Sequence, residues 1–125
     1  MEFTQAGIIL FTQNFDACVA FYDKVLGLEK LYEIDREGER LTTFRLGNLY
    51  LMVETDGIAR RSPKTVAQSP VKFRFNVPDV YSASAGLRAK GIAIDVVEHT
   101  WGVTAEFCDP DGNRCALRSD AGFGQ

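Results

Sequence analysis

The sequence lacks the features of an exported, membrane-spanning or nucleic-acid-binding protein. Its cysteines are few and odd in number, and their spacing matches no metal-binding motif: Cys18, Cys108 and Cys115. We therefore expect free thiols and a reducing compartment. The apolar run in the start MEFTQAGIILF is too short for a signal peptide or a membrane span, and no basic residue precedes it. A net charge of −3 without a basic run makes nucleic acid and anionic membranes poor partners, so we predict a cytoplasmic protein.

Histidine is also scarce, since His99 is the only one in the chain. A single histidine without two nearby acids makes a poor metal site, so we expect His99 to lie in a loop, close to water, just before the seventh strand. The chain does have enough hydrophobic residues, 46% of 125, to build the core of one compact domain.

The chain contains one pattern of predicted elements twice. Each copy has an apolar strand, an amphipathic helix that ends at a glycine, and three further strands. In the first copy these are a strand at 7–11, a helix capped by Asn14 and ended by Gly27, and strands at 28–34, 41–46 and 49–54. In the second they are a strand at 71–77, a helix capped by Asp79 and ended by Gly91, and three strands that reach Arg118.

The segment 56–70, DGIARRSPKTVAQSP, separates the two copies and has no sustained period, so it is interpreted as a linker or a mobile loop. We predict an α+β protein with a single domain at 1–125, built from a βαβββ module at 1–55, the linker at 56–70 and a second βαβββ module at 71–120. A repeat of this length predicts two similar half-sheets that bury their faces against one another or against a second chain.

Two motifs add a resemblance to a known family. The stretch FDACVAFYDKVLGLE resembles the first-helix signature, and WGVTAEFCDPDGNRCAL the closing hairpin, of the glyoxalase/bleomycin-resistance/extradiol-dioxygenase superfamily, also called the vicinal oxygen chelate (VOC) superfamily. The resemblance covers nearly the whole chain. It implies a glyoxalase/bleomycin-resistance fold, in which two βαβββ modules form a curled mixed sheet around a cleft, often completed in a homodimer.

The same resemblance indicates that the family's metal site is absent. It places the first-strand ligand on Gly7, the fifth-strand histidine on Lys72, the last-strand glutamate on Ala116 and the fourth-strand acid near Leu51. Glycine, leucine and alanine offer no donor atom, and a protonated lysine repels a cation. Glu54 comes within reach of the fourth-strand position only if the register slips, and it would find no partners there. We therefore predict no metal and no other cofactor.

Strand alternation lists what the inner face carries instead. If Gly7, Lys72 and Ala116 point inward, the same face holds a set of apolar and cationic residues: Ile9 and Phe11 on the first strand, Arg74 and Asn76 on the fifth, Arg114 and Arg118 on the eighth. The opposite parity, which includes Phe73, Phe75, Cys115 and Leu117, would pack under the helices. Phe11, Phe44 and Trp101 are candidates for apolar walls, although core packing is the commoner role of such residues, and Leu51 is counted among the ligand-binding positions.

One acid is expected among these cations. A hairpin that pairs Asp109 with Asn113 sets Glu106 opposite Ala116, within reach of Arg114 and Arg118. Glu106 and the arginines would then either neutralise one another at a strand end or dimer seam, or meet a ligand, because an unpaired charge on a concave surface is costly.

Three functions remain open at this point. The first, which the lost ligand set favours, is a metal-independent binding or sequestration protein for a small, partly apolar anion at Lys72, Arg74 and Arg118. The second is an enzyme: a lyase, isomerase or dioxygenase, metal-free with Glu106 as base or with a non-standard metal site. The third is a dimeric interaction module without a small ligand. The residues leave open whether any reaction is catalysed.

Overall fold

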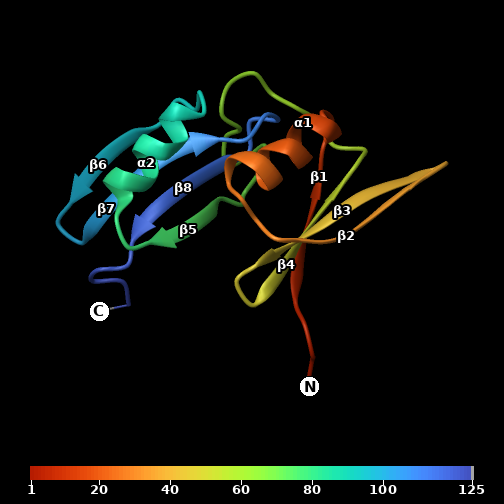
Figure 1. The fold of residues 1–125 in the computed structure, drawn as a ribbon, viewed down its shortest axis with the longest axis horizontal. Helices are drawn as coiled ribbons and strands as arrows, with labels where there is room; N and C mark the ends of the chain where they lie inside the picture. The colour runs from red at the N-terminus through yellow and green to blue at the C-terminus, as the bar shows by residue number, and fades with distance from the viewer. Residues whose placement is uncertain (125) are drawn as a thin grey trace. The chain divides into compact units, whose positions relative to one another are not determined.

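The computed structural model describes residues 1–124. The chain forms two compact units, Met1–Ala59 and Arg60–Gln125 (Figure 1). Each unit carries a four-stranded mixed sheet with the element order βαβββ, so the predicted α+β class and the repeat are confirmed. No helix within residues 1–124 is both long enough and apolar enough to cross a membrane.

The first unit begins with its edge strand. Its elements are β1 (Gly7–Phe11), α1 (Phe15–Ala20), the π-helical turn η1 (Phe21–Val25), β2 (Lys30–Arg36), β3 (Glu39–Leu46) and β4 (Leu49–Glu54). The sheet order is β1-β4-β3-β2, in which β1 runs parallel to β4 and the other neighbours are antiparallel.

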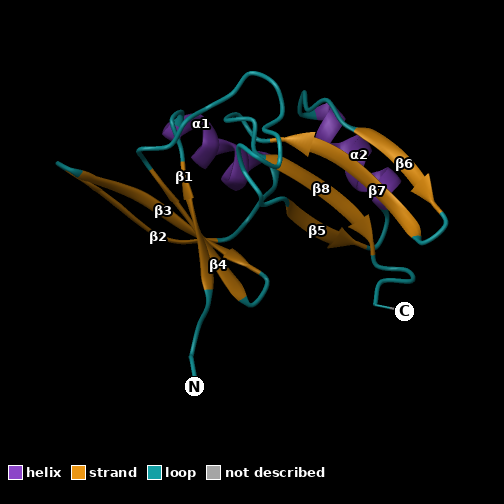
Figure 2. Ribbon diagram, turned by 180° about the vertical axis from the view of Figure 1, so that it is seen from behind, coloured by secondary structure: helices purple, strands orange, loops and turns teal. Residues whose placement is uncertain are grey.

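The second unit repeats this topology. Its elements are β5 (Phe73–Val77), α2 (Val80–Ala89), β6 (Asp95–His99), β7 (Gly102–Cys108) and β8 (Arg114–Ser119), with the sheet order β5-β8-β7-β6 and a parallel β5–β8 pair. In Figure 2 the strands β6, β7 and β8 lie in front of α2, so the viewer faces the side of the sheet that the helix leaves uncovered.

The two helices begin in different ways. Asp79 caps α2 as predicted, because its Oδ1 accepts hydrogen bonds from the backbone amides of Tyr81 and Ser82 at 3.0 and 3.2 Å. The side chain of Asn14 makes no such bond to α1, so that predicted cap is wrong. The Asn14 carbonyl accepts the first backbone hydrogen bond of this helix, from the amide of Cys18 at 2.9 Å.

The predicted first helix is also not one α-helix. It widens into the π-turn η1, and the adjacent side chains Phe21 and Tyr22 are both buried there, with their rings edge to face at 5.2 Å. Gly27 ends the segment with a φ of 69°, a left-handed conformation that glycine adopts at little cost.

The segment 56–70 is hydrogen-bonded at several points. Its first part belongs to the first unit, since the Gly57 amide donates to the Thr12 carbonyl at 3.0 Å. Its later part belongs to the second unit, where the amides of Arg60 and Lys64 donate to the carbonyls of Asp111 and Gly112, each at 2.9 Å. The ammonium group of the buried Lys64 also donates to Asn113 Oδ1 at 2.8 Å. These bonds attach residues 60–64 to the turn between β7 and β8.

Candidate functional site

The face of the second sheet that α2 does not cover, called here the open face, holds most of the predicted site residues. Register places Arg74, Ala116, Glu106 and Asp95 in one row across it and Asn76, Arg118, Thr104 and Val97 in the next. The hydroxyl of Tyr81 on α2 donates to Glu98, which lies on the opposite parity with the apolar residues. The predicted parity of β5 and β8, and the pairing of Glu106 with Ala116, are therefore confirmed.

Glu106 has a different partner from the one expected. Its Oε1 lies 3.0 Å from the Nζ of Lys72, the residue just before β5, and both side chains are well exposed. Of the alternatives left open for Glu106, pairing with Arg114 or Arg118 is not observed within residues 1–124, because both guanidinium groups donate to backbone carbonyls. An exposed ion pair of this kind contributes little to stability and can exchange partners.

Arg118 is the most buried charge on the open face, with only 4% of its surface exposed. Its Nη1 donates to the carbonyl and hydroxyl of Ser119 at 2.5 and 2.6 Å, and its Nη2 donates to the Trp101 carbonyl at 2.9 Å. Any side chain on Gly102 would collide with this guanidinium group. Within residues 1–124 no carboxylate forms an ion pair with Arg118, so its hydrogen bonds go to neutral oxygens.

Arg114 lies at the other end of β8, opposite Cys108. Its Nη2 donates to the Ser69 carbonyl at 2.6 Å, while its buried Nε finds no partner among the residues the structure describes. Burial raises the pKa of the Cys108 thiol, and the charges of Asp109 and Glu106 raise it further against the opposing effect of Arg114. Cys108 is therefore a neutral thiol near pH 7 and a poor nucleophile.

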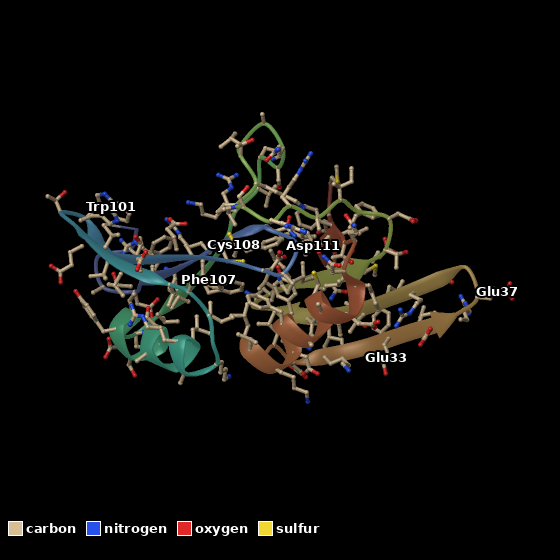
Figure 3. All side chains as sticks on the ribbon, turned by 90° about the horizontal axis from the view of Figure 1, so that it is seen from above. Glu33, Glu37, Trp101, Phe107, Cys108 and Asp111 are labelled. Carbon is tan, nitrogen blue, oxygen red and sulfur yellow. The ribbon has the colours of Figure 1, made fainter. Side chains whose placement is uncertain are left out.

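Aromatic rings line the end of the open face near the β6–β7 turn, where Figure 3 shows Trp101 far from Cys108 and Asp111. The Trp101 ring lies 5.1 Å from the Arg118 guanidinium carbon and stacks on His99 at 4.3 Å. The Phe123 ring lies 5.6 Å from the guanidinium carbon of Arg118 and 5.7 Å from that of Arg74. Sequence reasoning missed Phe123, for which the only signal is an aromatic residue among the glycines of AGFGQ.

His99 does not lie in a loop as expected. It is the last residue of β6 and pairs with Gly102 at the start of β7. Its Nε2 lies 2.9 Å from the hydroxyl oxygen of Thr104, and the residue is exposed. Gly102 has a φ of 151°, a backbone conformation that residues other than glycine rarely adopt.

On the first sheet, the face that carries Gly7 also carries the predicted site residue Phe11. Ile9 and Phe11 share that face and are about half exposed, at 48% and 52%. Phe44 and Leu51 are register partners on the opposite parity, and both are fully buried. The Phe44 ring packs at 6.4 Å from that of Tyr22 on η1, so Phe44 and Leu51 lie in the core of the first unit and not on the face that carries Gly7.

The residues at the expected metal-ligand positions do not fit a metal ion. The ring of Tyr50 covers Gly7 so closely that a side chain there would collide with it. Lys72 is an ammonium bound to Glu106, and Ala116 presents a buried methyl group. Among residues 1–124 no three His, Cys, Asp or Glu side chains gather as a metal would require.

Comparisons with known proteins agree with this fold. The family model described as Glyoxalase/Bleomycin resistance protein/Dioxygenase superfamily matches residues 4–117. A search of curated proteins finds no significant match.

Solved structures superpose over almost the whole chain. The crystal structure of SMU.1112c has a TM-score of 0.75 at 21% identity and covers 94% of this chain and 99% of its own. TnmS3, an antibiotic binding protein from Streptomyces sp. CB03234, has a TM-score of 0.71 at 18% identity, covering 95% and 98%. Lactoylglutathione lyase from Agrobacterium tumefaciens has a TM-score of 0.71 at 21% identity and covers 99% of this chain and 98% of its own. At such identities the likeness shows the fold alone.

Proposed function

Since this chain belongs to the glyoxalase/bleomycin resistance protein/dioxygenase superfamily, we propose that it is a metal-independent binding protein for a small, partly apolar anion. One observation carries the proposal: a ring, an ammonium group and a methyl group lie at Gly7, Lys72 and Ala116, where a metal enzyme of the family needs donor atoms. The structural relative TnmS3 is described as an antibiotic binding protein, which is consistent with a binding role on this fold.

The anionic group of the ligand would bind at Arg74 and Lys72. Arg74 is exposed, and within the described part of the chain no carboxylate pairs with it. Its guanidinium can bind a carboxylate or phosphate through two parallel hydrogen bonds. Lys72 can exchange Glu106 for the ligand, because their ion pair is exposed. Arg118 would add its positive charge without donating a hydrogen bond to the anionic group, since its Nη1 and Nη2 already donate to carbonyls.

The apolar part of the ligand would contact Trp101 on the second sheet, which is about half exposed. Arg114 has a smaller role in this proposal, because its Nη2 is bound to Ser69.

A thermal-shift screen of anionic, neutral and cationic metabolites tests the proposal. A ligand at a hundred times its dissociation constant adds about 2.7 kcal/mol to the free energy of unfolding, which is a midpoint rise of several degrees for a domain of this size. We expect the stabilising compounds to be anions, and their effect to be largely lost in Arg74→Gln. Arg45→Gln is the matched control, because Arg45 is an exposed arginine of the first unit that is paired with Glu29. Mainly cationic ligands, or anions that bind Arg74→Gln undiminished, would refute the proposal.

An enzymatic function has one observation in its favour. Lys72 and Glu106 form an ammonium–carboxylate pair at 3.0 Å on the same face, which is an arrangement that can move a proton to or from a bound ligand. If a bound compound is converted, Glu106→Gln would abolish the conversion and leave binding in place. If Glu106→Gln turns over the compound at the wild-type rate, Glu106 is not a catalytic base.

We also propose a cytoplasmic homodimer. The odd number of cysteines, Cys18, Cys108 and Cys115, and the absence of a metal-ligand spacing among them favour a reducing compartment. The row Ile9, Met52, Thr43 and Tyr32 on the first sheet includes apolar side chains that are about half exposed, and a second chain could cover them. Light scattering at micromolar concentration should give twice the chain mass of 13.9 kDa. A monomer mass would reject the dimer.

A further inference from the structure

We propose that the ligand of the open face is a flat aromatic anion, such as an arenecarboxylate, and that the ring of Phe123 occupies its position as an internal competitor. The inference rests on the proposed function and adds to it the class of ligand and a means of control. It starts from the contact of one ring with two guanidinium groups.

Arg74 and Arg118 are diagonal neighbours on β5 and β8, since Arg74 pairs with Ala116 and Arg118 with Asn76. Their guanidinium carbons lie 5.7 and 5.6 Å from the centre of the Phe123 ring, within the range of a cation–π contact. Two cations therefore share one uncharged ring, and no carboxylate in the described residues, 1–124, pairs with either of them.

Phe123 satisfies only part of what these two cations can bind. A ring offers its electron-rich face, whereas an aromatic acid offers the same face together with a carboxylate for the exposed Arg74. A flat arenecarboxylate would thus keep the ring contact and add a charge-assisted hydrogen bond. This is the reason for preferring an aromatic anion to an aliphatic one.

The turn that carries Phe123 is held by few bonds. The Asp120 amide donates to the Val77 carbonyl and the Phe123 amide to the Asp120 carbonyl, both at 3.0 Å. The bond from Arg118 Nη1 to the Ala121 carbonyl is long, at 3.4 Å. The Phe123 ring is 51% exposed, so displacing it uncovers little buried surface.

The chain provides its own reporter for this site. Trp101 is the only tryptophan, and its ring lies 5.1 Å from the Arg118 guanidinium carbon. Its indole N–H gives a single resonance in a ¹H–¹⁵N spectrum. A ligand that stacks beside Arg118 should shift that resonance, and a titration then yields a dissociation constant.

The experiment compares three probes that differ in one property each: benzoate, cyclohexanecarboxylate, which keeps the charge but is not flat, and benzamide, which keeps the ring but not the charge. We expect benzoate to bind most tightly and both analogues several-fold more weakly. In Phe123→Ala the benzoate dissociation constant should fall by about five- to thirtyfold, because the competing ring contacts are gone and the binding-competent state is always populated.

Matched variants separate competition from other effects. Phe3→Ala removes a phenylalanine of the first unit that is even more exposed, at 73% against 51% for Phe123, and should leave the dissociation constant unchanged. Phe123→Leu keeps an apolar side chain without the ring and should also tighten benzoate binding. Arg74→Gln in the Phe123→Ala background should remove most of the gain.

The outcomes distinguish this inference from the function on which it rests. If wild type binds anions but Phe123→Ala binds benzoate equally or more weakly, Phe123 is no competitor and the inference is wrong, while the proposed function stands. Equal binding of benzoate and cyclohexanecarboxylate would also overturn it. If neither wild type nor Phe123→Ala binds any of the anions in the wider screen, both proposals fail.

Discussion

The two units share a topology but differ in the chemistry of one row of side chains. Across the first sheet, register aligns Ile9, Met52, Thr43 and Tyr32. Across the second, the corresponding row is Arg74, Ala116, Glu106 and Asp95. The same strand order therefore carries a largely apolar row in one unit and a charged row in the other. Strand pairing fixes the backbone of each sheet, and packing against the helix restricts the side chains on that face. The side chains on the other face can differ between the two units without a change of fold.

The turns before the last strand of each unit should show the largest contrast in stability. Asp109 is buried, and its carboxylate accepts from the amides of Asp111 and Asn113 and from the Asn113 side chain, at 2.8 to 2.9 Å. Asp109→Ala should lower the free energy of unfolding by roughly 3–5 kcal/mol in urea denaturation. The exposed Asn48 in the β3–β4 turn is the counterpart, and Asn48→Ala should change it by less than about 0.5 kcal/mol. Equal losses would erase the contrast.

The thiols should differ in reactivity between positions. Cys18 and Cys115 are fully buried and should react with iodoacetamide only after unfolding. Cys108 is partly exposed, but its pKa is raised, first by burial and then by Asp109 and Glu106. At pH 8, Cys108 of the folded protein should be alkylated several-fold more slowly than Cys108 of the protein unfolded in urea. As the pH rises further, the alkylation rate of the folded protein should still increase where that of the unfolded protein has become constant. Mass spectrometry of the modified peptides measures this, and a native rate equal to the rate in urea would contradict it.

Each unit also buries one hydroxyl without a hydrogen-bond partner among the described residues, Thr43 in the first and Ser84 in the second. Removing such a group relieves its desolvation cost. Thr43→Val and Ser84→Ala should each raise the free energy of unfolding by about 0.5–1 kcal/mol, measured by urea denaturation. A loss of stability in either variant would mean that the hydroxyl has a partner, such as a bound water molecule.

The smallest effect is expected at the exposed ion pairs. Lys72–Glu106 in the second unit and Arg45–Glu29 in the first have similar N–O distances, 3.0 and 2.9 Å, and similar exposure. Double-mutant cycles with Glu106→Gln and Glu29→Gln should give coupling energies below about 1 kcal/mol that fall further with salt. A markedly larger coupling for Lys72–Glu106 would mean that the open face is less solvated than its exposure suggests.

Local sequence signals predicted the elements with short-range causes. The apolar run of β1 and the GN turn before β4 gave the observed bounds, Gly7–Phe11 and Leu49–Glu54. Asp79 capped α2 as its position implied. The hairpin pairing of Asp109 with Asn113 predicted that Glu106 lies opposite Ala116, and alternation along β5 and β8 predicted which of their residues share a face. In each case the cause lies within a few residues of the effect.

Apart from the local errors at Asn14, in the first helix and at His99, the errors concern partners that are distant in sequence. Phe44 and Leu51 were assigned to the wrong face because the register of β4 against β1 depends on a parallel pairing that no local pattern encodes. Alternation placed Glu106 on the open face but could not choose Lys72 over the arginines. Phe123 was missed because its contact with Arg74 arises only when the C-terminal turn meets the sheet.

The parallel pairing of the first and last strands also constrains the order of folding. In each unit the three later strands join neighbours through short turns, whereas β1 must meet β4, and β5 must meet β8, across an intervening helix and two strands. Closing such a long loop costs chain entropy before any contact is gained, so the three-stranded meander should form first and the edge strand should dock last. The amides of β1 and β5 would then exchange with solvent through openings that leave the meanders intact.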